Sequence, residues 1–385
     1  MAGIYFHIPF CKTRCVYCDF FSSTHTKEKA DYVEAMCREL QERKDYLQGQ
    51  AIETVYFGGG TPSQLSAKDF EKLFSVISSV ARNLTCPVGP TEQSRFLATL
   101  EMTEVTLEAN PDDITPAYLD SIKHLPFNRI SLGIQSFNNA ELKFLNRRHD
   151  AQSAIRAVQL CLEYGFQNIS IDLMYGLPNQ TLEIWEENIR QAIALDIQHV
   201  SAYHLIYEEG TPLFELLQQG RIQPVDEDVS VEMFTLLIDR LAEAGFEHYE
   251  ISNFARPGFH SRHNSSYWNG THYLGIGASA HSYNGVSRQW NKQVHGARYA
   301  MQGFEMERIE EKTAYNDFIL TRLRTMKGID LDELQSLFGE EKKNDCWKQA
   351  QKFLDNQLLE ITGNRLRLTR KGIFVSDGIM SDLME

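Results

Sequence analysis

The sequence predicts an α/β fold built on a parallel sheet, followed by a smaller C-terminal unit. Short β-branched or aromatic runs alternate with amphipathic segments through the first two-thirds of the chain. Glycine, proline or polar residues follow nearly every run, and the alternation stops after about residue 220. Successive βα units imply right-handed crossovers, and therefore a doubly wound sheet or a full or partial barrel.

Each predicted strand is a short segment with β-branched or aromatic residues, and a turn signal follows nearly every one. The predicted strands are Ile4–Ile8, Thr54–Phe57, Glu104–Glu108, Arg129–Ile134, Ile169–Leu173 and Val200–Leu205. The helices predicted between them are Ala67–Ala81, Ala117–His124, Ala151–Tyr164 and Glu183–Leu195. Ser66 with Asp69 fits a capping box, Thr115 before Pro116 fits an N-cap, and Gly165 fits a helix end. The long, irregular segment Arg82–Thr103 is expected to be a surface insertion.

The remainder of the chain follows another pattern. A helix is predicted over Asp228–Ala244, and a stretch rich in His, Tyr, Trp, Asn and Gly continues to about residue 300. Helices are then predicted at Ala314–Met326, Leu331–Phe338 and Asp345–Asn356, before a hairpin around Gly363. This order resembles a winged helix. We therefore expect domains at 1–225, 226–305 and 306–385, the second extending the first.

Composition limits the classes of partner. The 385 residues carry a net charge of −14, which disfavours nucleic-acid binding because that depends on neutralising phosphates. The basic run at 364–371 alternates with apolar residues, as on the solvated face of a strand. No apolar run approaches the ~20 residues of a membrane span, and no signal sequence is visible, so we expect a cytoplasmic protein without membrane insertion.

Three cysteines directly after the first strand are the strongest chemical signal. Cys11, Cys15 and Cys18 could hold an iron–sulfur cubane and leave one iron open to a small molecule. The same spacing could instead form a packing stripe on a helix, or a zinc site completed by His7 or His25. The scattered cysteines Cys37, Cys86, Cys161 and Cys346 are expected in the core.

The C-x3-C-x2-C loop after a first strand resembles the radical S-adenosylmethionine superfamily. The resemblance implies a partial (β/α)6 barrel of the TIM type that binds a 4Fe-4S cluster and S-adenosylmethionine. It assigns the cluster to the three cysteines. The residues that it implies around S-adenosylmethionine are Tyr5, Tyr17, Gly59, Gly60, Thr61, Glu108, Gln135, Arg147 and Asp172.

Further motifs narrow the resemblance to one branch of that superfamily. The segments His7–Cys11, Tyr17–Phe20, Phe57–Pro62 and Gln135–Phe137 resemble the branch that contains oxygen-independent coproporphyrinogen dehydrogenase and the HemW heme chaperones. The dehydrogenase has a further cysteine where Phe20 stands here, and a long extension before its cysteine loop. Both departures favour the HemW branch.

A second motif also favours the HemW branch. The segment His263–Trp268 reads H-N-x-x-Y-W, which resembles HemW, and this resemblance suggests His263 as a heme ligand. His260, His272 and His281 are alternatives on chemistry alone, and His263 could instead hydrogen-bond while the aromatic residues pack. The resemblance implies heme and heme-accepting proteins as partners, with respiratory-chain proteins among the candidates, and it is compatible with a homodimer.

Three functions follow for testing. The leading one is a heme chaperone that carries a cluster and S-adenosylmethionine, with no catalytic residue assigned. The second is a coproporphyrinogen dehydrogenase, which Phe20 disfavours. The third is a zinc-stabilised regulator that uses the winged-helix-like unit, which the acidic charge disfavours.

Overall fold

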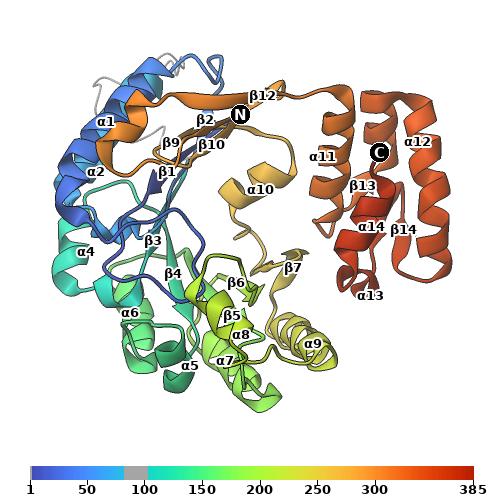
Figure 1. The fold of residues 1–385 in the computed structure, drawn as a ribbon, viewed down its shortest axis with the longest axis horizontal. Coiled ribbons are helices and arrows are strands. Elements are labelled where there is room, and N and C mark those ends of the chain that lie inside the picture. Colours follow the sequence, from blue (N-terminus) through green and yellow to red (C-terminus); the bar gives the residue numbers. More distant parts are fainter. Residues whose placement is uncertain (1, 82–102) are drawn as a thin grey trace.

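The main body is a curved sheet with helices on its outer side, and a smaller unit lies beside it (Figure 1). The computed structural model describes residues 2–81 and 103–385. The predicted insertion Arg82–Thr103 lies outside these residues except for Thr103. The centre of the sheet is parallel, in the order β9-β1-β2-β3-β4-β5-β6. Its strands are β1 (Ala2–Ile8), β2 (Ile52–Gly59), β3 (Glu104–Ala109), β4 (Arg129–Gln135), β5 (Ile169–Tyr175), β6 (His199–His204) and β9 (His272–Ile276).

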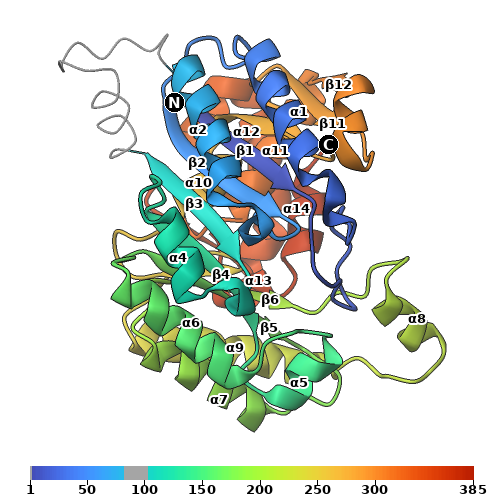
Figure 2. The ribbon, with the colours of Figure 1, turned by 90° about the vertical axis from the view of Figure 1, so that its left-hand side faces the viewer.

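The strand order decides between the two predicted architectures. Strands β1 to β6 neighbour one another in chain order, and the connecting helices lie on the convex side of the sheet (Figures 1 and 2). A doubly wound sheet would reverse its order and carry helices on both faces. The fold is therefore a partial barrel, and all six predicted strands are confirmed.

Short antiparallel strands extend both edges of the parallel sheet, and the sequence did not predict them. Strands β8 (Asn253–Ala255) and β7 (Glu247–Glu250) follow β6 at one edge. At the other edge β10 (His281–Tyr283), β11 (Ser287–Asn291) and β12 (Phe304–Arg308) follow β9. Within the described part of the chain the two edges do not pair, so the barrel stays open.

Amphipathic helices cover the outer face of the sheet. They are α1 (Lys29–Glu42), α2 (Ala67–Ala81), α4 (Pro116–Ile122), α5 (Asn139–Phe144), α6 (Ala151–Glu163), α7 (Leu182–Ala194) and α9 (Glu227–Glu243). The predicted start and stop signals are confirmed. Ser66 and Asp69 bond reciprocally, Thr115 accepts from the Tyr118 N–H, and Gly165 has a φ of +90°. Helix α8 (Pro212–Gln218) projects from the body (Figure 2), although Leu213 at its start is buried and its N–H donates to the Val16 carbonyl.

The C-terminal unit has the element order of a winged helix. It comprises α11 (Glu311–Leu323), β13 (Ile329–Asp330), α12 (Leu331–Asp355), β14 (Leu359–Thr362), β15 (Arg365–Leu368), α13 (Arg370–Ile373) and α14 (Ser376–Leu383). The two helices predicted over 331–356 are both present in α12, which is interrupted at Gly339 by a non-helical φ of 86°. The predicted domain boundaries at 225 and 305 stay predictions.

Ion pairs occupy three arginines of the basic run 364–371. Arg365 pairs with Asp330, Arg367 with Glu360, and Arg370 with Asp239 of α9. Leu366 and Leu368 are buried between them, so the run is the outer face of β15 as predicted. These guanidinium groups are already neutralised within the protein, which argues against a phosphate-binding surface here.

Two further predictions concern the cysteines and the membrane. Cys37, Cys161 and Cys346 are buried with free thiols, as expected, and Cys86 lies outside the described residues. No helix in the described ranges is long and apolar enough to cross a bilayer.

Candidate functional site

A cavity of about 410 Å³ opens at the carboxyl ends of the parallel strands. It brings together most of the side chains predicted for the site, although they come from six separate segments. The predicted residues that line it are Cys11, Cys15, Tyr17, Cys18, Gly59, Gly60, Thr61, Glu108, Gln135, Arg147 and Asp172. Strand ends meet at one edge of a parallel sheet, which is why residues so far apart in sequence converge here.

The cysteines lie on an irregular loop between β1 and α1. The Cys11 N–H donates to the Ser23 carbonyl (3.0 Å), and the Ser23 N–H donates back to Pro9. The Val16 N–H donates to the carbonyl of Leu145, which holds the middle of the loop against α5. Residues 11–20 form no helix, only a single turn closed by the Cys18 N–H and the Cys15 carbonyl, so the packing-stripe alternative is wrong.

Hydrogen-bond donors point at two of the cysteine sulfurs. The Thr61 hydroxyl donates to Cys11 Sγ (3.4 Å), and Arg147 Nη1 donates to Cys15 Sγ (3.3 Å). Asn110 joins these donors, because its amide donates to Thr61 and its oxygen accepts from Arg147 Nη2 (2.5 Å). A continuous chain of polar contacts therefore links Cys11 to Cys15, and its donors suit sulfurs that carry negative charge.

The glycines after β2 allow close approach to the cysteine loop. A Cβ on Gly60 would lie 2.8 Å from the Ile8 carbonyl oxygen and 3.1 Å from Cys11 Sγ. Gly59 has a φ of +106°, and a Cβ there would meet the His7 ring at 2.7 Å. The space next to Cys11 thus exists only because position 60 lacks a side chain.

The cysteines fit a cluster better than a single metal ion. Within the described ranges, no three His, Cys, Asp or Glu side chains converge on a point where one ion would be held. A structural zinc site requires such convergence of its ligands. A cubane binds each thiolate at a separate iron, so it requires three thiolates around one cavity, which is the arrangement observed.

Two carboxyl groups form the floor of the cavity. Burial raises the pKa of Glu108 to about 7, although hydrogen bonds from Tyr56 (2.6 Å) and the Gly59 N–H (3.2 Å) oppose the shift. Burial likewise raises the pKa of Asp172 to about 6, against hydrogen bonds from Ser201 and Ser131. Such carboxyl groups can accept hydrogen bonds from the hydroxyl or ammonium groups of a ligand. These hydrogen bonds become stronger once the carboxyl group ionises.

The raised pKa of Glu108 leads to a pH-dependent stability. An unfolded Glu ionises near pH 4.5 and the folded Glu108 near 7, so the native state holds the extra proton between these values. Stability conferred by that proton is lost as pH rises from about 4.5 to 7. Glu108→Gln should remove this loss, gaining on the order of 2 kcal/mol over wild type at pH 8 and little at pH 4. Urea unfolding at the two pH values measures the difference; equal gains at both would contradict the assignment.

Gln135 ends β4 in an unusual backbone conformation. Its φ is +69°, in the left-handed region, and the register between β4 and β5 shifts between Leu132 and Gln135. A bulge of this kind redirects a side chain at the end of a strand. Strained non-glycine residues gather at functional sites, and Gln135 lines the cavity.

A second polar cluster, centred on Asp113, joins the loops around the rim. Asp113 accepts from Lys12 (2.5 Å) in the cysteine loop and from Ser63 (2.8 Å) and Gln64 (2.6 Å) after β2. Arg148 also contacts it at 3.5 Å. Burial alone would raise the pKa of Asp113, but its hydrogen bonds from Lys12 and Ser63 outweigh burial and lower it.

Sequence reasoning missed Asn110, Asp113 and the pocket residue Tyr203. The sequence carries a signal for Asn110, because this residue follows β3 directly and polar residues after strands line such sites. Asp113 gave no such signal, since it lies in a short 3-10 turn at Pro111–Asp113 and its partners come from three loops.

Tyr5 and His263 were predicted to contact cofactors, but neither lines the cavity. Tyr5 lies inside the barrel, where its hydroxyl is 3.1 Å from His7 Nδ1. His263 lies on α10 (Arg262–Trp268) and is 1% exposed. Its Nδ1 is 2.8 Å from Thr54 Oγ1 and its Nε2 is 2.9 Å from the Tyr267 hydroxyl. Both ring nitrogens are occupied and buried, which argues against the predicted role of His263 as a heme ligand.

Comparisons with known proteins agree with the fold and the cysteine motif. The family model "Radical SAM superfamily" matches residues 5–192, and "HemN C-terminal domain" matches residues 309–375. The Heme chaperone HemW of Lactococcus lactis is 32% identical over 99% of this chain and 96% of that protein. The Heme chaperone HemW of Escherichia coli K12 is 36% identical over 72% of this chain and 69% of that protein.

One solved structure matches the whole chain. Coproporphyrinogen III oxidase (HemN) from Escherichia coli superposes with a TM-score of 0.80 at 21% identity, covering 100% of this chain and 90% of that one. At this identity the match supports the barrel and its C-terminal unit as a fold, without deciding the activity.

Proposed function

Because this chain belongs to the HemW family of radical SAM proteins, we propose that it is a heme chaperone, which binds heme and delivers it to other proteins. The observation that carries the proposal is the cavity in which three cysteines face two carboxyl groups and the glycine loop, within a chain related to HemW over its whole length. Fold alone would not separate a chaperone from an enzyme, so the membership in this family is needed.

The cavity supports a 4Fe-4S cluster and S-adenosylmethionine as resident groups. Cys11, Cys15 and Cys18 would hold the cluster, which supplies single electrons and one iron open to a ligand when bound. Thr61 and Arg147 donate toward the sulfurs and would stabilise their negative charge. For S-adenosylmethionine, Gly59 and Gly60 leave room beside the loop, while Gln135, Glu108 and Asp172 offer polar groups along the cavity wall. Tyr17 lines the same cavity, and Tyr5, a partly buried residue of β1, would pack near the adenosyl group.

We propose that heme rests at the mouth of this cavity, on exposed apolar side chains. Phe20 is 63% exposed, Ile206 is 64% exposed and Tyr203 is 41% exposed, and all three line the cavity. Large apolar side chains exposed together around an opening mark a binding surface, and a porphyrin face is apolar and flat. Phe20 occupies the position at which the dehydrogenase has its extra cysteine, so the same residue separates the two functions.

The remaining parts of the proposal concern location and recipients. The recipients would be heme-accepting proteins, with respiratory-chain proteins among them, and the location the cytoplasm. A homodimer is compatible with the open edge strand β12, whose residues are all exposed. Nucleic acid is not a proposed partner, given the net charge of −14 and the paired arginines of β15.

The first test is an anaerobic titration of the cluster-loaded protein with hemin, followed by absorbance, beside a coproporphyrinogen turnover assay. Saturable heme binding without turnover is expected. Phe20→Ser combined with Ile206→Ser should weaken heme binding on the order of tenfold, because each removes an apolar contact. Leu337→Ser is the matched control, since Leu337 is 59% exposed on α12 and away from the cavity. Turnover of coproporphyrinogen would overturn the chaperone proposal in favour of the dehydrogenase, and equal heme binding by all variants would remove the mouth as its site.

A further inference from the structure

The H-N-x-x-Y-W segment is held inside the barrel, although it was expected to face a ligand. Helix α10 lies on the concave side of the sheet, between the strands and the C-terminal unit (Figure 1). The buried Glu104 of β3 accepts from the N–H groups of Arg262 (3.1 Å) and His263 (3.0 Å). These bonds fix the start of α10 to the sheet, so that His263 points at the neighbouring strand β2.

A chain of direct contacts runs from His263 to the floor of the cavity. The His263 ring stacks on Tyr56, with centroids 4.8 Å apart and an interplanar angle of 24°. The Tyr56 hydroxyl donates to Glu108 at 2.6 Å, and the other oxygen of Glu108 accepts from the Gly59 N–H. The imidazole thus supports the ring that orients a carboxylate of the cavity.

This contact path is closely packed on the sides of Gly58 and Tyr267, whereas a small cavity of about 50 Å³ adjoins Tyr56 and Glu108 on the side of Asp172. A Cβ on Gly58 would lie 2.8 Å from the Tyr56 ring and 3.1 Å from Glu108 Oε1. On its other side, Tyr267 bonds to His263 Nε2 and packs edge-on against Tyr273 at 4.8 Å. Closely packed side chains transmit a displacement to their neighbours, because they cannot absorb it in voids.

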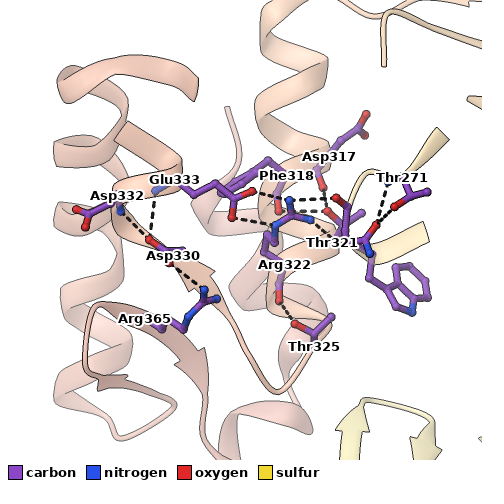
Figure 3. A network of polar contacts seen from close by, with 12 residues as sticks. Thr271, Asp317, Phe318, Thr321, Arg322, Thr325, Asp330, Asp332, Glu333 and Arg365 are labelled. Atoms are coloured by element: carbon purple, nitrogen blue, oxygen red, sulfur yellow. Dashed lines mark hydrogen bonds and ion pairs between the residues drawn. The ribbon is translucent and has the colours of Figure 1, made fainter. Parts of the chain in front are cut away.

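The other end of α10 is bound by the C-terminal unit. Arg322 of α11 donates to the Trp268 carbonyl (2.5 Å) and to Glu333 (2.7 Å), and Figure 3 shows Arg322 and Glu333 directed at one another. The Arg324 guanidinium lies over the Trp268 ring at 4.7 Å and pairs with the fully buried Glu250. No residue of the C-terminal unit lines the cavity, so any influence on it must pass through the barrel.

We propose that the H-N-x-x-Y-W segment is a positioning element that couples the seating of the C-terminal unit to the cofactor cavity. Arg322 and Arg324 hold Trp268, α10 carries His263, and His263 with Tyr56 sets Glu108. The segment therefore acts on S-adenosylmethionine through Tyr56 and Glu108, and His263 touches neither heme nor cofactor. The inference rests on the proposed function only in taking this cavity as the S-adenosylmethionine site.

The test measures S-adenosylmethionine affinity by equilibrium dialysis on cluster-loaded protein whose iron content has been checked. Arg322→Gln removes the donors to Trp268 from a position outside the cavity and should raise the Kd on the order of threefold. Tyr56→Phe keeps the stack but removes the hydroxyl and should raise the Kd on the order of tenfold. The double variant Arg322→Gln/Tyr56→Phe should bind S-adenosylmethionine no more weakly than Tyr56→Phe alone. The reason is that the contact path from Arg322 to Glu108 is already broken at Tyr56.

A matched control separates this path from general loosening of the C-terminal unit. Arg370→Gln breaks another contact between that unit and the barrel, to Asp239 of α9, and should leave the Kd unchanged. His263→Phe keeps a ring on Tyr56, so it should restore most of the affinity that His263→Ala loses while heme titrations of both match wild type.

Three outcomes would overturn the proposal. The first is an unchanged S-adenosylmethionine affinity in Arg322→Gln. The second is a Kd in the double variant that rises by the product of the two single effects. The third is a loss of affinity in Arg370→Gln as large as that in Arg322→Gln. Arg324→Lys, which keeps a charge beside Glu250, serves as the second variant if Arg322→Gln fails to fold. Wild-type protein that loads iron but does not bind S-adenosylmethionine would contradict the proposed function, and is therefore distinguishable from failure of the coupling.

Discussion

Replacing Cys15 by alanine is expected to remove the iron. Anaerobically reconstituted wild-type protein should be brown and contain about four irons and four sulfides per chain. In Cys15→Ala two thiolates remain, and the Arg147 donor that faces Cys15 Sγ loses its acceptor. Iron should therefore fall to background, together with the absorbance of the cluster. Iron and sulfide analysis with absorbance spectra measures the loss.

Cys346→Ala is the matched control, because Cys346 is a buried thiol in the C-terminal unit and remote from the cavity. It should lose some stability through the cavity it creates but keep its iron. A Cys15→Ala protein that retained a full cluster, or a colourless wild-type protein that took up one zinc, would show that the loop holds something else.

The second large effect is expected at the floor of the cavity. Asp172→Ala should weaken S-adenosylmethionine binding on the order of 10- to 100-fold, because a charge-assisted hydrogen bond contributes roughly 1.5–3 kcal/mol. Glu108→Ala should act similarly, and both proteins should keep their iron since neither carboxyl contacts a cysteine in the structure. Isothermal titration of cluster-loaded protein measures the affinity.

Glu141→Gln provides the comparison for these variants. Glu141 is also a buried carboxyl group with a burial-raised pKa, but it bonds to Ser136 and Asn188 and does not line the cavity. The S-adenosylmethionine affinity of Glu141→Gln should match that of the wild-type protein. If Glu108→Ala and Asp172→Ala also matched wild type, neither residue would belong to the cofactor site.

The sequence predicted the parallel strands because β-branched, aromatic or other apolar residues recur in them at every second position, as in β5, where Ile169, Ile171 and Leu173 alternate with Ser170 and Asp172. Strand β11 shows where this signal fails. It buries Ser287, Gln289 and Asn291, so no apolar alternation marks it. These polar groups are tolerated because two of them bond to α1 and the residue that follows it: Glu39 accepts from Asn291, and Arg43 donates to Gln289. Only tertiary contacts reveal such a strand.

The sequence predicted the site residues that lie near the carboxyl ends of strands. It did not predict how deeply a side chain is buried inside the barrel. Glu108 lies one residue before the end of β3, as predicted, whereas Asp172 was predicted to end its strand and instead lies at the middle of β5. His263 lies in a motif rich in histidine and aromatic residues, which reads equally well as a ligand site or as a packed interior. Burial and the hydrogen bonds at both ring nitrogens decide between these, and neither can be read from the sequence. The residues that orient others, such as Asn110 and Asp113, carry no motif of their own.

The contacts of Asp113 also determine how the rim of the cavity moves. Lys12, Ser63 and Gln64 belong to two loops that would otherwise fluctuate separately, and Arg148 adds a third segment. Since one carboxylate bonds to all of them, displacing Asp113 breaks the bonds to all three segments at once. We therefore expect the segment that carries Asp113 to open at a higher free energy, and to be better protected against amide hydrogen exchange, than a loop without such bonds. Besides the contacts to its own sulfurs and backbone, the cysteine loop is thus also held by Asp113, which bonds to Lys12 and to no cysteine.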